Sequence, residues 1–117
     1  MIGDSLLVHP IVEYMTSTVN VYFPIGIESN IWYHFETFKK VERSRGVITF
    51  EAPLDYTPVF IKGGSIIFKK ERRRRSSYQM INDPFTIIIA LDNKQESSGT
   101  LYWDDGNTYN YQTKGEY

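Results

Sequence analysis

The sequence has no cysteine and only two histidines, His9 and His34. The absence of cysteine excludes a disulfide framework and a thiolate zinc site. Two histidines with scattered carboxylates are a weak basis for a metal site, because no local spacing places several ligands on one face. We therefore predict no metal centre and no cofactor.

Long apolar runs and an excess of positive charge are also missing. The longest aliphatic run, Ile87–Leu91, is far shorter than the roughly 20 residues that a membrane-spanning helix needs. Thirteen Lys and Arg against 14 Asp and Glu give a net charge of −1, so no overall positive field attracts nucleic acid. The sequence predicts neither a membrane span nor a nucleic-acid partner.

Aromatic residues are abundant, at 15% of the chain. Aromatic and β-branched side chains suit pleated, half-buried surfaces. Val19, Val21 and Phe23 alternate with other residues, which indicates a strand with that face toward a core. No segment shows ten residues of helical period with caps. We predict an all-β, antiparallel β-sandwich whose strands lie near residues 6–8, 19–23, 31–35, 47–50, 58–61, 65–69, 85–91, 101–103 and 108–111.

Some segments leave alternatives open. Residues 38–42 fit a short helical turn or a loop. Gly63–Gly64 fits a turn between two strands or a bulge within one. Residues 85–91 are apolar on both faces, which predicts that both faces are covered. Residues 104–107 carry the Asp-Gly signal of a hairpin between aromatic strands.

The polar stretch of residues 71–83 is the best internal boundary. We expect a proximal β-sandwich over residues 1–78 and the opening strands of a distal β domain over residues 79–117. Because no closing element follows the last predicted strand, we expect the distal domain to be truncated. Apolar surface that further strands would cover should then be exposed and favour association.

Candidate catalytic groups fail on spacing. Asp104 and Asp105 lie in one predicted turn, so they cannot flank a sugar ring from opposite walls of a cleft. Asp4, Ser5 and His9 crowd one short strand and lack a nucleophile elbow. Gly63–Gly64 precedes neither a Lys-Ser/Thr pair nor a helix, so it is not a phosphate-binding loop. We predict no catalytic residue in this chain.

A basic run gives one set of binding candidates. Residues 69–75 hold six of the 13 basic residues. The anion-contact candidates are Arg72, Arg73, Arg74 and Arg75, for phosphate or an acidic surface. The alternative is a solvated strand whose arginine stems lie on apolar surface.

Aromatic residues give the second set. Trp32, Tyr102 and Trp103 are of the type that stacks on the faces of sugar rings. Strand aromatics also serve as core residues or cross-strand pairs. Both interpretations stay open from the sequence.

Five further segments form an ordered set: GDSLLVHP (3–10), VYFP (21–24), IWY (31–33), PVFIKGGSII (58–67) and LYWDDGNTY (101–109). In this order they resemble the C-terminal part of glycoside hydrolase family 31. Residues 74–77, 83–84 and 110–112 look most like the branch of the family that trims glucose from N-linked glycans in the endoplasmic reticulum. His34 and Phe68 depart from the family's usual Asp and Pro.

The resemblance implies a non-catalytic role. In this family a (β/α)₈ barrel carries the catalytic Asp residues that remove terminal α-linked glucose with retention. None of the barrel's motifs can be placed on this chain, so no catalytic role carries over. The resemblance implies a β-sandwich that packs against the barrel and supports its loops, and a chain that is inactive alone.

The resemblance also suggests partners and a location. The partners would be the upstream barrel of a parent chain, a carbohydrate bound by the parent enzyme and a regulatory β subunit. The location would be the lumen of the endoplasmic reticulum. Two alternatives come from the residues themselves: a stand-alone carbohydrate-binding β-sandwich, and a binder of anionic surfaces or nucleic acid through Lys69–Arg75.

Overall fold

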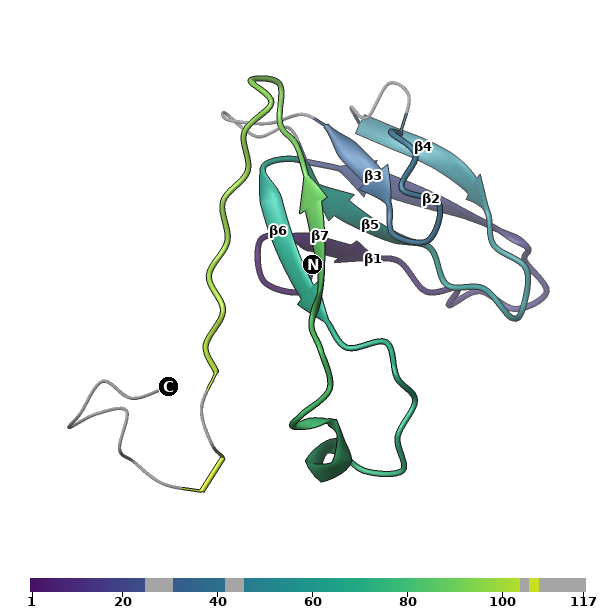
Figure 1. Cartoon of the computed structure of the whole chain (residues 1–117). Coiled ribbons are helices and arrows are strands. Elements are labelled where there is room, and N and C mark those ends of the chain that lie inside the picture. Colours follow the sequence, from purple (N-terminus) through teal and green to yellow (C-terminus); the bar gives the residue numbers. More distant parts are fainter. Residues whose placement is uncertain (25–30, 42–45, 104–105, 108–117) are drawn as a thin grey trace.

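Seven β-strands and one short 3₁₀ helix make up the described chain (Figure 1). The computed structural model describes residues 1–24, 31–41, 46–103 and 106–107. Its elements are β1 (Leu6–Val8), β2 (Thr18–Phe23), β3 (Trp32–His34), β4 (Gly46–Glu51), β5 (Val59–Lys62), β6 (Ser65–Lys69), η1 (Ser77–Met80) and β7 (Thr86–Ala90). The predicted all-β fold is confirmed.

The strands form three small antiparallel sheets, with the orders β1-β5-β3, β2-β4 and β6-β7. In the first sheet, Phe60 of β5 lies opposite Leu7 of β1, and Ile61 lies opposite Tyr33 of β3. Strands β2 and β4 pair over six residues from Thr18↔Glu51 to Phe23↔Gly46. β5 is therefore the middle strand of the sheet between its two neighbours.

The β1-β5-β3 sheet is packed on both faces. Phe60 and Ile61 are both fully buried, and successive side chains of a strand point to opposite faces. Phe60 belongs to a core with Val21 and Phe23 of β2, whereas Ile61 belongs to a second core with Ile88 of β7. The β2-β4 sheet thus covers one face and the β6-β7 ribbon covers the other. Burial of each large apolar side chain contributes about 1.5–3 kcal/mol.

Aromatic rings fill the first core. The centroid of the Phe23 ring lies 5.0 Å from Phe60, at an interplanar angle of 80°, and 5.5 Å from Trp32. Phe50 of β4 closes the group, 4.8 Å from Phe60. Edge-to-face pairs of this kind add about 0.5–1.5 kcal/mol beyond burial of their area. The alternation predicted for β2 is confirmed, because Val19, Val21 and Phe23 all face this core.

Gly63 and Gly64 carry the chain from the middle sheet to the ribbon. The amide of Gly63 donates to Ile31 O (2.7 Å), and that of Gly64 donates to Ala90 O (2.7 Å). Gly64 has φ +89°, a conformation that residues with a side chain rarely adopt. The sequence alternative of two strands around a Gly-Gly turn is therefore the correct one.

Some local expectations need correction. Residues 101–103 form no strand, and the 3₁₀ helix η1 was not predicted. Residues 38–41 form a loop, which is one of the two alternatives that the sequence left open. The expected strand at 108–111 and the turn residues Asp104–Asp105 lie outside the described residues. Residues 101–103 lack a ladder partner among the described residues, and strand propensity alone does not supply one.

The outer face of β7 also differs from expectation. Ile88 and Ala90 are buried, but Ile87 and Ile89 are 54% and 58% exposed. The prediction that both faces of this strand are covered is therefore wrong for this chain. The apolarity of the strand is real, but only its inner face meets the middle sheet.

The predicted division into residues 1–78 and 79–117 falls in the loop between β6 and β7. These two strands pair over five residues, from Ser65↔Ala90 to Lys69↔Thr86. The division stays a prediction, and the hydrogen-bonded ribbon spans it.

We predict that Phe60→Ala lowers the free energy of unfolding by about 3–5 kcal/mol, because the substitution leaves a cavity where the aromatic core meets the middle sheet. Urea unfolding followed by circular dichroism measures the change. Val47→Ala on the exposed face of β4 is the control and should cost less than about 1 kcal/mol. Equal costs for the two variants would contradict a core centred on Phe60.

Candidate functional site

The segment that joins β6 to β7, residues 70–85, carries most of the basic run, and we call it the basic loop. Lys70 anchors its base. The Lys70 Nζ donates to Met80 O (2.5 Å) and Ile81 O (2.9 Å), at the end of η1. The same ammonium lies 4.5 Å from the ring centroid of Phe85 and 4.1 Å from that of Trp103. Lys70 is therefore engaged inside the fold.

Asp83 is the second anchor of the basic loop, and it is only 7% exposed. Arg74 donates to it through two nitrogens, with Nε–Oδ2 at 2.9 Å and Nη2–Oδ1 at 2.7 Å. Arg72 Nη1 lies 3.5 Å from Oδ1. A bidentate arginine–carboxylate pair is among the stronger and more directional polar contacts in proteins. Two of the four predicted anion-contact arginines are thus occupied by the chain's own carboxylate.

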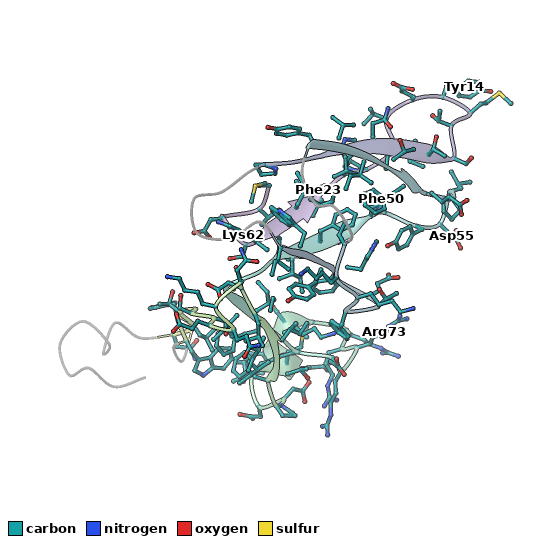
Figure 2. The ribbon with its side chains drawn as sticks, turned by 90° about the horizontal axis from the view of Figure 1, so that it is seen from above. Tyr14, Phe23, Phe50, Asp55, Lys62 and Arg73 are labelled. Atoms are coloured by element: carbon teal, nitrogen blue, oxygen red, sulfur yellow. The ribbon has the colours of Figure 1, made fainter. Side chains whose placement is uncertain are left out.

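Arg73 and Arg75 differ from Arg72 and Arg74. Both are exposed, and the described residues include no hydrogen-bond or ion-pair partner for either guanidinium. Figure 2 shows the Arg73 side chain extending away from the ribbon. The structure therefore divides the four arginines into an inner pair, Arg72 and Arg74, and an outer pair, Arg73 and Arg75.

The electrostatics of the inner pair follow from its geometry. The hydrogen bond from Arg74 lowers the pKa of Asp83 below its usual value, helped by the positive charges of Arg74, Arg72 and Lys70 and opposed by desolvation. The same contact raises the pKa of Arg74. Asp83 is thus held as a carboxylate that closes the loop.

We predict that Asp83→Asn weakens the fold at neutral pH and flattens its loss of stability in acid. The folded-state pKa of Asp83 lies below the unfolded value of about 3.9, so its stabilisation is complete above that pH. The stabilisation disappears as the pH falls through the folded-state pKa. Thermal unfolding between pH 7 and pH 2 measures the effect.

The control for this prediction is Asp92→Asn. Within the described part of the chain, the Asp92 carboxylate accepts hydrogen bonds from two backbone amides of its own turn, those of Lys94 and Glu96. If the melting temperatures of wild type and Asp83→Asn fall in parallel as the pH is lowered, the role given to Asp83 is contradicted.

The three sugar-contact candidates also divide into buried and exposed residues. Trp32 is 1% exposed and packs in the aromatic core, so the expectation that its ring stacks on a sugar is corrected. Strand β3 is covered on both faces, which the sequence pattern did not reveal. Tyr102 and Trp103 are 61% and 38% exposed. Trp103 stands edge-to-face with Phe85, with centroids 5.0 Å apart.

A hollow beside β3 and β4 was not predicted. Its volume is about 470 Å³, and it is lined by His34, Thr37, Lys39, Lys40, Val41, Ile48, Phe50 and Tyr56. Burial lowers the pKa of His34, whose ring lies 4.9 Å from Phe60. Burial and the charge of Glu36 raise the pKa of Tyr56. Both directions favour the neutral forms of His34 and Tyr56.

The remaining polar groups do not assemble a catalytic site in the described chain. Ser5 Oγ donates to Asp4 Oδ1 at 3.4 Å, and His9 Nδ1 contacts Pro10 O instead of the serine. No group of three or more His, Asp and Glu side chains in the described ranges could hold a metal ion. No helix within them is long and apolar enough to cross a membrane.

The described part of the chain thus consists of stacked, small antiparallel sheets. A family model described as the glycosyl hydrolase family 31 C-terminal domain matches residues 1–67. The chain belongs to glycoside hydrolase family 31.

Relatives and solved structures agree with this assignment. The chain is 46% identical over 117 residues to neutral alpha-glucosidase AB of Dictyostelium discoideum and 40% identical over 119 residues to the human protein of that name. All of this chain matches 12% of the length of each relative. It therefore spans about an eighth of the proteins that it resembles.

Solved structures give the same picture of the fold. The glucosidase II alpha subunit bound to a disaccharide superposes with a TM-score of 0.81 at 30% identity, over 92% of this chain and 11% of that chain. A family 31 dextranase of Flavobacterium johnsoniae superposes with a TM-score of 0.77 at 35% identity, over 96% of this chain and 13% of that one. The all-β, antiparallel fold is thus shared with C-terminal regions of this family.

Proposed function

We propose that this chain is a non-catalytic β region of an α-glucosidase-like enzyme and that it packs against the catalytic (β/α)₈ barrel. Catalytic geometry is sensitive to displacements of about 1 Å, so a rigid supporting layer has a direct effect on rate. The observation that carries the proposal is the amount of apolar surface that the described chain leaves uncovered. Two surfaces are involved.

The first surface is the outer face of the β6-β7 ribbon. Ile87, Ile89, Leu91 and Phe85 are 54%, 58%, 41% and 37% exposed. Side chains of this size rarely gather on the free surface of a monomeric domain unless another surface covers them. They therefore fit contact with another part of a larger enzyme.

The second surface is one end of the sandwich, where the β1–β2 and β4–β5 connections meet. The amide of Ala52 donates to Ser17 O (2.7 Å), which holds the two connections together. Val12, Tyr14, Met15 and Leu54 are almost fully exposed there, and Figure 2 shows Tyr14 at the far tip of this end. These side chains would contribute to the same kind of contact.

The names of the relatives support a proposal for the reaction of the parent enzyme. We infer that the larger enzyme hydrolyses terminal α-linked glucose with retention, as in the trimming of N-linked glycans in the endoplasmic reticulum lumen. One similar solved structure is a heterodimer of the ER glucosidase II catalytic subunit with the binding domain of its regulatory subunit. That heterodimer supports a regulatory β subunit as a partner of the parent enzyme.

The prediction for the first surface concerns Ile87→Ser/Ile89→Ser. This double variant should bind less anilinonaphthalene sulfonate and associate less in light scattering than wild type, because it removes exposed apolar area. Its free energy of unfolding should change by less than about 1 kcal/mol. Ile88→Ser is the matched control on the inner face and should cost at least about 3 kcal/mol.

Two results would contradict the proposal. One is equal dye binding by wild type and the double variant, which would mean that this surface is not the uncovered one. The other is release of nitrophenol from an aryl α-glucoside by the purified 117-residue chain above background, which would mean that the chain carries its own catalytic groups.

A second candidate function is carbohydrate binding through Tyr102 and Trp103. Their exposure supports it, whereas Trp32 cannot take part without unpacking the core. If it is correct, titration with α-linked gluco-oligosaccharides changes tryptophan fluorescence, and the change disappears in Trp103→Phe. An unchanged spectrum at saturating sugar would exclude this function, because Trp32 stays buried and is insensitive to sugar.

A further inference from the structure

The charge of the chain is unevenly distributed around the basic loop. Residues 69–83 contain six basic and two acidic residues, while the rest of the sequence contains seven basic and twelve acidic residues. The positive charge is therefore local, although the whole chain is slightly negative. A local excess of this kind attracts anionic groups only over short range, because salt screens charge beyond about 8–10 Å.

The structure shows which of the six cations are already used. Lys69 pairs with Glu71 (2.9 Å), and Lys70 is held by two carbonyls and two aromatic rings. Arg74 and Arg72 share Asp83. Arg73 and Arg75 remain exposed, with no partner among the described residues.

The outer arginines lie on a loop that is held together by hydrogen bonds at two positions. Lys70 is bonded across ten and eleven residues to the carbonyls at the end of η1. Arg74, between the two outer arginines, is bonded across nine residues to Asp83. A binding group that is already positioned loses less conformational entropy when it binds. The two internal contacts therefore restrain the stretch of loop that carries Arg73 and Arg75.

We propose that Arg73 and Arg75 form a docking surface for an acidic segment, rich in Asp and Glu, of another protein. Guanidinium groups bind carboxylates through two parallel hydrogen bonds. Nucleic acid is the less suitable partner, because its long anionic backbone would also meet the net negative remainder of the chain, whereas a short acidic segment need not extend beyond the basic loop. The proposal is independent of the barrel-packing role, since it concerns a different surface.

The test measures fluorescence anisotropy of a labelled oligoglutamate peptide with the full 117-residue chain at low salt. Wild type should bind this peptide and not an oligoglutamine peptide of equal length. Arg73→Gln/Arg75→Gln should weaken binding roughly tenfold, as expected for the loss of two exposed charge pairs. Its melting temperature should equal that of wild type, because both side chains are exposed and neither has a hydrogen-bond or ion-pair partner among the described residues.

Two control variants separate this surface from net charge. Arg72→Gln removes an arginine from the same loop that already faces Asp83, and Lys39→Gln/Lys94→Gln removes two exposed charges elsewhere. Each should change the dissociation constant by no more than about twofold.

Any of three results overturns the proposal. The first is no binding of oligoglutamate by folded wild type. The second is a loss in either control as large as that in Arg73→Gln/Arg75→Gln. The third is tighter binding of single-stranded RNA of matched length than of oligoglutamate, which would assign the surface to nucleic acid instead.

Discussion

Burial of β5 on both faces is the constraint on which the rest of the structure depends. Phe60 and Ile61 are adjacent in sequence, fully buried and directed to opposite sides of the sheet. A sheet with large apolar side chains on both faces is stable only if a layer covers each face. The β2-β4 sheet covers Phe60, and the β6-β7 ribbon covers Ile61. The Gly63–Gly64 turn is needed because the chain must leave β5 and enter that ribbon within two residues.

The same reasoning, applied to the ribbon, explains why the domain suits a supporting role. Ile88 and Ala90 face Ile61, so period two directs Ile87 and Ile89 away from the core. The third layer is therefore apolar on the side where the described chain offers no cover. A strand of this composition is typical of the interior of a larger protein, and the relatives are about eight times as long as this chain. Exposure of the outer face of β7 thus follows from the same packing that buries its inner face.

Local patterns predicted much of the fold, and long-range contacts explain the failures. Strand β2 was predictable because Val19, Val21 and Phe23 repeat with period two. The burial of Trp32 was not predictable, because tryptophan suits both a core and a sugar-binding surface. The residue type therefore does not indicate whether another layer covers it. The pairing of Arg74 with Asp83 joins residues nine positions apart across an irregular loop, and no periodicity indicates it. A count of basic residues therefore could not separate the structural arginines from the available ones.

That separation also decides what the basic loop can do. Four consecutive guanidinium groups repel one another, and a single carboxylate, Asp83, offsets that repulsion for Arg74 and Arg72. Arg73 and Arg75 stay in water, where like charges cost little but still oppose closure of the loop. An external carboxylate removes this repulsion without requiring any cation of the chain to be buried, so it avoids the main cost of ion pairing. The inner pair, Arg72 and Arg74, gives the loop its shape, and the outer pair, Arg73 and Arg75, leaves positive charge that has no ion-pair partner among the described residues.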